Sequence, residues 1–154
     1  MTRDAALKAL DRRPYSRGEL TDLLLRKRAS PEDIETVLDS LEDVGLIDDE
    51  VFAAQWVESR RRTRHLSRSA LYAELRAKKI DGEIIESALS SIEPEDEYET
   101  ALRFATMKVR SYAHLDRSVA YRRLLGALMR KRFSSDLCHS LARQLLHIDD
   151  EDRW

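Results

Sequence analysis

Hydrophobic residues recur along this 154-residue chain with the spacing of amphipathic helices. Residues 84–92 and 98–112 show it most clearly, with an apolar position every three or four residues. Phe52, Trp56 and Val57 continue the same spacing in another segment. Nowhere do polar and apolar residues alternate for long enough to suggest a half-buried strand. The pattern predicts an all-α fold.

Capping residues mark where these helices begin. Ser16 and Glu19 form a capping box, in which each side chain accepts a hydrogen bond from an otherwise unpaired backbone N–H. Ser30 and Pro31 supply a cap and a proline at the first helical position. Nine helices are predicted, at about residues 4–12, 17–28, 31–44, 49–64, 68–79, 82–92, 95–112, 117–132 and 135–147.

The sequence repeats itself twice. A shift of 51 residues aligns Ser16 with Ser67, Leu20 with Leu71, Leu24 with Leu75, Lys27 with Lys78, Ile34 with Ile85, Leu38 with Leu89 and Leu41 with Ile92. A further shift of 53 aligns Leu71 with Leu124, Leu75 with Leu128, Lys78 with Lys131, Ile80 with Phe133, Ile85 with Cys138 and Ile92 with Leu145. We predict three tandem three-helix repeats at residues 1–47, 48–93 and 94–148, followed by an acidic tail at 149–154. Because units of this size bury too little surface alone, the repeats should stack into an elongated array.

Composition disfavours a membrane protein and a secreted protein. No apolar run approaches the roughly 18 residues that span a membrane, and charged residues interrupt the N-terminal segment where a signal peptide would be apolar. The single cysteine, Cys138, cannot form an internal disulfide. It aligns with Ile34 and Ile85, so we expect it to be a small core residue. These features favour a soluble cytoplasmic chain.

Charge alternates along the chain, although the net charge is only −2. Residues 3–28 hold 8 basic and 4 acidic side chains, whereas residues 30–50 hold 9 acidic ones and no basic one. The change of sign then recurs, with residues 57–79 and 103–132 basic and residues 81–99 and 133–154 acidic. Solvent screens charges over about 8 Å, so we expect separate basic and acidic stripes on the surface, which would select the partner.

The basic blocks supply the candidate binding residues. Either they form solvated helix faces or they contact an anionic partner, and two runs in the same repeat register favour contact. The excess of arginine suits bidentate contacts with carboxylate or phosphate. The candidates are Arg60, Arg61, Arg62, Arg64, Arg68, Arg76, Lys78, Lys79, Arg122, Arg123, Arg130, Lys131 and Arg132, with Arg117 in the same run.

Residue types that carry catalysis or bind cofactors form no recognisable set. The four histidines are scattered, and Cys138 and His139 point to opposite faces of their helix. The glycines form no phosphate-binding loop. The pair Asp48 and Asp49 more plausibly caps a helix than binds a metal. We therefore expect no catalytic residue, metal or cofactor, and a binding protein rather than an enzyme.

The segment from Gly45 to Arg60, with its Gly-x-Ile-Asp-Asp-x-x-Phe-Ala core, resembles the RecX family of recombinase regulators, as do Leu71, the run 74–78 and Ile80. Residues 16–20 resemble the opening repeat of that family. The resemblance covers residues 5–147 and implies tandem three-helix repeats in a curved, elongated molecule. It implies a cytoplasmic regulator of recombination, DNA repair and the SOS response that binds the RecA nucleoprotein filament along its groove. Such a protein depresses ATP hydrolysis, strand exchange and co-protease activity, contacts single- or double-stranded DNA weakly or through the filament, and is expected to be a monomer that binds no membrane.

One departure from the family concerns the end of the second helix of each repeat. The family has Lys-Gly there, and this chain has Lys27-Arg28, Lys78-Lys79 and Lys131-Arg132. If the second residue adopts the left-handed conformation, its side chain costs on the order of 1 kcal/mol. The gain is an extra cation at a helix C-terminus, where the helix dipole favours it.

Two alternatives remain open from the residues alone. A free-standing DNA-binding protein is one, because three-helix units can act as helix-turn-helix modules. Acidic residues at the recognition position, such as Glu32, Asp33 and Glu83, oppose it because phosphates repel them. The other is a protein-binding scaffold anchored by Trp56 and Trp154, although we expect Trp56 to lie in the core beside Phe52.

Overall fold

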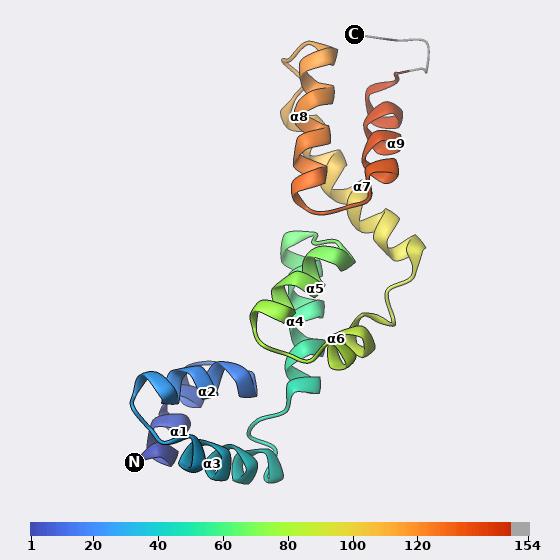
Figure 1. The fold of residues 1–154 in the computed structure, drawn as a ribbon. Coiled ribbons are helices and arrows are strands. Elements are labelled where there is room, and N and C mark those ends of the chain that lie inside the picture. The colour runs from blue at the N-terminus through green and yellow to red at the C-terminus, as the bar shows by residue number, and fades with distance from the viewer. Residues whose placement is uncertain (149–154) are drawn as a thin grey trace. The chain divides into compact units, whose positions relative to one another are not determined.

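The computed structural model describes residues 1–148, and all regular structure in this range is helical (Figure 1). The all-α prediction is confirmed, and each predicted helix has a counterpart. The helices are α1 (Thr2–Arg12), α2 (Arg17–Arg26), α3 (Pro31–Asp43), α4 (Asp49–Arg64), α5 (Arg68–Ala77), α6 (Gly82–Leu89), α7 (Pro94–Ser111), α8 (Arg117–Arg130) and α9 (Ser135–Leu146). No helix in the described range is long and apolar enough to cross a membrane.

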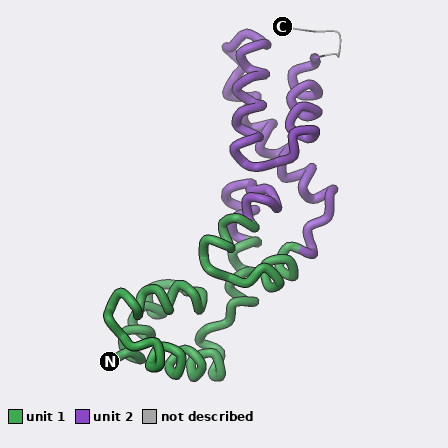
Figure 2. The backbone as a smooth tube through the Cα atoms, viewed as in Figure 1, with its two compact units in different colours: residues 1–58, 72–89 green, residues 59–71, 90–154 purple. Residues whose placement is uncertain are grey.

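The chain forms two compact units (Figure 2). Unit 1 comprises residues 1–58 and 72–89, and unit 2 comprises residues 59–71 and 90–154. The division falls inside α4 and α5, since each of these helices contributes to both units. The repeat boundaries at 47/48 and 93/94 stay predictions, and the predicted acidic tail lies outside the described residues.

Each unit has its own apolar core. In unit 1, α1, α2 and α3 bury the aligned leucines and isoleucines of the first repeat, including Leu20, Leu24 and Leu38. In unit 2, α7, α8 and α9 bury Leu124, Leu128 and their neighbours. The Cys138 side chain is fully buried in this second cluster, so its predicted role as a core residue is confirmed.

The helix starts follow the capping residues of the sequence. Ser16 and Glu19 form the predicted capping box, and Ser30 accepts from the Asp33 amide. Asp48 Oδ1 accepts from the amides of Glu50 and Val51 at 3.0 and 3.2 Å. Asp48 is therefore a cap, as predicted.

The second helix of each repeat ends two residues before its predicted end, because a non-glycine residue adopts the left-handed conformation there. The φ angles are +65° at Arg28, +63° at Lys79 and +64° at Arg132. In the first repeat, the amide of Arg28 donates to Leu25 O and the amide of Ala29 donates to Leu24 O, the pattern of a Schellman motif. Left-handed backbone is uncommon outside glycine and costs roughly 1–2 kcal/mol. The departure from Lys-Gly therefore places strained cations at three equivalent helix ends.

Candidate functional site

In unit 1, the N-terminus of α2 packs against the C-terminal end of α5. The buried Ser16 hydroxyl donates to the carbonyl of Lys78 at 2.5 Å, and the Arg17 amide donates to Asp49 Oδ1 at 2.9 Å. A Cβ on Gly18 would lie 2.4 Å from Lys79 Cβ, so glycine is needed for this approach. We call this contact, made by residues 16–22 with Asp49, Lys78 and Lys79, the first junction.

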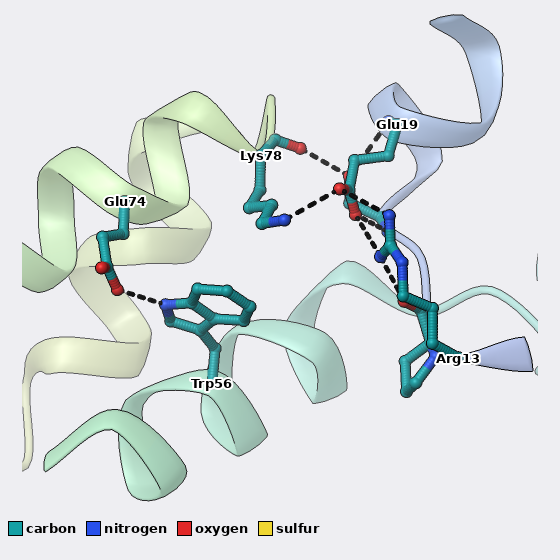
Figure 3. A network of polar contacts seen from close by, with 7 residues as sticks. Arg13, Glu19, Trp56, Glu74 and Lys78 are labelled. Atoms are coloured by element: carbon teal, nitrogen blue, oxygen red, sulfur yellow. Dashed lines mark hydrogen bonds and ion pairs between the residues drawn. The ribbon is translucent and has the colours of Figure 1, made fainter. Parts of the chain in front are cut away.

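Carboxylates surround the cations of the first junction. Glu19 Oε2 lies 3.1 Å from Lys78 Nζ and 3.2 Å from Arg13 Nη2 (Figure 3). Burial acts to raise the pKa of Glu19, but hydrogen bonds from Arg13, the Ser16 amide and Lys78 outweigh it, and the pKa is lowered. Lys79 Nζ lies 3.4 Å from Asp22. Both candidate lysines of this junction therefore have carboxylate partners.

Trp56 forms one wall of the same network. Its ring stacks on Phe52 with centroids 5.9 Å apart, and Lys78 Nζ lies 5.0 Å from its centroid. The indole N–H donates to Glu74 Oε1 at 2.9 Å (Figure 3). Trp56 lies beside Phe52 as predicted, but it is half-buried and not part of the buried core.

Unit 2 contains a second junction built from the equivalent atoms. The Ser67 hydroxyl donates to the carbonyl of Lys131 at 2.6 Å, and the Arg68 amide donates to Glu97 Oε1 at 2.9 Å. Ser67 and Lys131 occupy the repeat positions of Ser16 and Lys78. The N-terminus of one second helix thus meets the C-terminal end of the next one in both units.

The second junction lacks the carboxylates that pair with Lys78 and Lys79 in the first. The positions of Glu19 and Asp22 are occupied by Ala70 and Ala73. Lys131 Nζ donates to the carbonyl of Arg64 at 2.7 Å, and it lies 5.1 Å from the centroid of Phe104.

His65 lies beside Phe104 in unit 2, and the pKa of its imidazole is lowered. Its ring lies 6.3 Å from that of Phe104. Burial lowers the pKa of His65, and the charges of Lys131 and Arg103 lower it further. Burial is thus the main cause of the lowered pKa, and the two cations add to it.

The structure divides the thirteen candidate residues unequally. Arg76, Lys78 and Lys79 belong to unit 1, and the other ten belong to unit 2. Arg61 donates to Thr100 Oγ1 at 3.2 Å, and Arg76 donates to the carbonyl of Ile80 at 3.2 Å. Lys78, Lys131, Arg60, Arg61 and Arg68 are partly buried. The exposed candidates are Arg62, Arg64, Arg76, Lys79, Arg122, Arg123, Arg130 and Arg132.

Two residues have roles that the sequence patterns did not indicate. Asp49 was expected to cap its own helix, but it accepts from the amide of Arg17 in α2. The Arg17 side chain contacts three carboxylates of α3, at 3.4 Å for Glu35, 2.9 Å for Asp39 and 3.0 Å for Glu42. These contacts link a basic block to the acidic block that follows it. Within residues 1–148, no group of three or more metal-binding side chains comes together.

Comparisons with known proteins agree with this repeat architecture. The description "RecX, first three-helix domain" matches residues 3–41, the second three-helix domain of RecX matches residues 48–89, and the third matches residues 95–141. The crystal structure of RecX from Lactobacillus salivarius has the same fold, with a TM-score of 0.80 over 96% of both chains and 24% sequence identity.

Relatives with higher sequence identity carry the same family name. The regulatory protein RecX of Streptomyces lividans is 42% identical over 151 residues, which is 97% of this chain and 80% of the relative. The regulatory protein RecX of Thermobifida fusca is 37% identical over 147 residues, 96% of this chain and 80% of the relative. With three matching domains and this identity over nearly its whole length, the chain belongs to the RecX family of regulatory proteins.

Proposed function

We propose that this protein binds the RecA nucleoprotein filament and inhibits its ATPase, strand-exchange and co-protease activities without catalysing a reaction. The observation that carries the proposal is the second junction, where the repeated backbone contact keeps its cations while Ala70 and Ala73 occupy the positions of Glu19 and Asp22. Ten of the thirteen candidate residues lie in unit 2, which contains this junction. We assign the main filament contact to unit 2.

Exposed arginines suit both anionic surfaces that a nucleoprotein filament offers. Arg64, Arg130 and Arg132 are exposed on unit 2 and can form bidentate contacts with DNA phosphates or with carboxylates of recombinase subunits. Several weak contacts along one chain raise the overall affinity through their effective concentration. A bound protein of this kind would block the subunit motion or the DNA access that turnover requires.

The direct test measures RecA ATPase on single-stranded DNA as this protein is added. We expect ATP hydrolysis to fall as the filament becomes saturated. Unchanged hydrolysis at saturation, with binding shown by co-sedimentation, would disprove the proposed inhibition.

Two charge-reversal double variants test whether the filament contact lies in unit 2. Arg130→Glu/Arg132→Glu changes exposed cations of unit 2, and Arg26→Glu/Arg28→Glu changes the same repeat positions in the first repeat. Both double variants alter the net charge by the same amount, and Arg28 and Arg132 share the left-handed conformation. We expect only the unit 2 variant to lose co-sedimentation with filaments, and equal losses would contradict the assignment to unit 2.

Binding measurements with DNA alone distinguish this proposal from the alternative of a free-standing DNA-binding protein. DNA binding without RecA that equals filament binding and falls steeply with added salt would favour that alternative. Our proposal expects weak binding to DNA alone. We also propose that the protein acts as a monomer in the cytoplasm, where its lone buried thiol stays reduced.

A further inference from the structure

Unit 1 contains a hollow of about 140 Å³ between α1 and α2. Its lining has an apolar wall and a basic rim. The lining residues are Ala5, Lys8, Ala9, Arg12, Tyr15, Leu23 and Lys27. None of them is among the thirteen candidates for filament contact. We propose that this hollow is a binding site for an acidic peptide segment that inserts one apolar side chain.

The wall of the hollow is apolar and fixed in position. Ala9 is buried, and Ala5 and Leu23 are partly buried. Tyr15 is held from one side, because the Arg13 guanidinium lies 3.6 Å from the centroid of its ring. Arg13 is in turn held by Glu19 of the first junction (Figure 3). A wall that is already ordered spares the ligand the entropic cost of ordering it.

The volume of the hollow matches a single apolar side chain of the ligand. A cavity of about 150 Å³ with apolar walls accommodates a benzene ring. A leucine or phenylalanine side chain therefore matches the space. Burying such a side chain contributes about 1.5–3 kcal/mol, or roughly 10- to 100-fold in affinity.

The rim of the hollow is positively charged. Lys8, Arg12 and Lys27 are all exposed, and within residues 1–148 none of them has an ion-pair partner. They differ in this respect from Lys78 and Lys79, which pair with carboxylates. Three cations around an apolar hollow complement a segment with acidic residues on both sides of an apolar one.

The same features favour a peptide over single-stranded nucleic acid. Nucleic acid without sequence preference binds through rows of aromatic side chains that stack with successive bases. The hollow offers only Tyr15, and the Arg13 guanidinium already covers one face of that ring. The remaining wall is aliphatic and matches a side chain rather than a base.

The test uses the full chain and two fluorescein-labelled peptides, Asp-Glu-Asp-Leu-Asp-Glu-Asp and the same sequence with serine in place of leucine. Fluorescence anisotropy measures their binding. We expect the leucine peptide to bind at least about tenfold more tightly than the serine peptide. Equal binding of the two peptides, or no binding of the leucine peptide at about 1 mM protein, would overturn the proposal.

Two variants separate the rim from the wall. Lys8→Glu/Lys27→Glu reverses the rim charge, and Ala5→Phe fills the hollow with the charge unchanged. We expect each variant to weaken binding of the leucine peptide by about tenfold or more. Circular dichroism should confirm that the helix content of each variant is native. The control is Arg26→Glu/Arg28→Glu, which alters the net charge of the first repeat equally at residues outside the lining.

The control and a competitor exclude the other interpretations. An equal loss in the control variant would reduce the effect to general attraction by positive charge and would disprove the site. Displacement of the leucine peptide by oligodeoxythymidine, with the same sensitivity to Ala5→Phe, would assign the hollow to nucleic acid instead. Because filament binding is proposed for unit 2, the rim variant should retain co-sedimentation with filaments, which keeps the two proposals distinguishable.

Discussion

The two junctions share their backbone contacts and differ in the charges beside them. In each, a buried serine hydroxyl donates to a lysine carbonyl, and an acidic side chain accepts from the following backbone amide. Glu19 and Asp22 pair with the lysines of the first junction, whereas Ala70 and Ala73 occupy those positions in the second. The comparison teaches that the backbone contacts of the junction form without carboxylates at the positions of Glu19 and Asp22.

The largest expected effect concerns the close approach at Gly18. Gly18→Val places side-chain atoms where a Cβ would already lie 2.4 Å from Lys79 Cβ and 3.0 Å from the Lys79 carbonyl. We expect a loss of about 2 kcal/mol in the free energy of unfolding, measured by urea denaturation. The matched variant is Ser69→Val at the equivalent, exposed position of the second junction, where we expect a change within about 0.5 kcal/mol. Equal effects would show that both junctions are packed alike.

The next effect transfers the carboxylate of Glu19 from the first junction to the second. In Ala70→Glu, the new side chain should reach Lys131 as Glu19 reaches Lys78. Neutralising this charge should weaken co-sedimentation with RecA filaments by about tenfold at physiological salt. The control, Ala70→Gln, has the same shape without the charge, and it should bind like the natural protein. An equal loss in the control would attribute the effect to shape.

A smaller effect appears on acid titration of the first junction. The pKa of Glu19 is lowered in the folded protein, so its contribution to stability is full above the ordinary value of about 4.3 and is lost as pH falls through the lowered value. We expect Glu19→Gln to reduce the free energy of unfolding by about 1 kcal/mol at pH 7 and by less near pH 3. Urea denaturation across this range checks it, and a deficit that stays constant with pH would contradict the assignment.

The smallest effect is the titration of His65. Burial first, and then Lys131 and Arg103, lower the pKa of this imidazole. The folded state therefore binds a proton less readily than the unfolded chain, and stability decreases as pH falls below the ordinary value of about 6.5. Lys131→Met should raise the pKa of His65 toward that value, as measured by NMR titration. An unchanged pKa would show that the charge of Lys131 does not act on His65.

Much of the fold could be predicted from the sequence because its signals are local. Helical spacing and capping residues such as Ser16 and Ser30 act within one or two turns, and nearly all helix starts agree with them. The early ends of the second helices also had a local signal, since Lys-Gly in the family marks a left-handed residue. Arg28, Lys79 and Arg132 adopt that conformation without glycine.

The candidate site was less predictable because charge counts ignore pairing across the chain. Lys78 and Glu19 are 59 residues apart in the sequence, so nothing near Lys78 indicates that it has a partner. The repeat alignment did contain a usable signal, since Glu19 and Asp22 align with Ala70 and Ala73. Asp49 had no such signal, because a carboxylate at the start of a helix is expected to cap that helix.

The left-handed cations offer a practical means of changing thermal resistance. Replacing Arg28 with glycine would relieve an unfavourable backbone conformation in the first repeat, outside the thirteen candidate residues, and should raise the melting temperature by a few degrees. The same exchange at Arg132 would relieve similar strain but remove a positive charge from the proposed filament contact. A glycine at the end of the second helix would therefore favour thermal stability, whereas an arginine there favours binding to the filament.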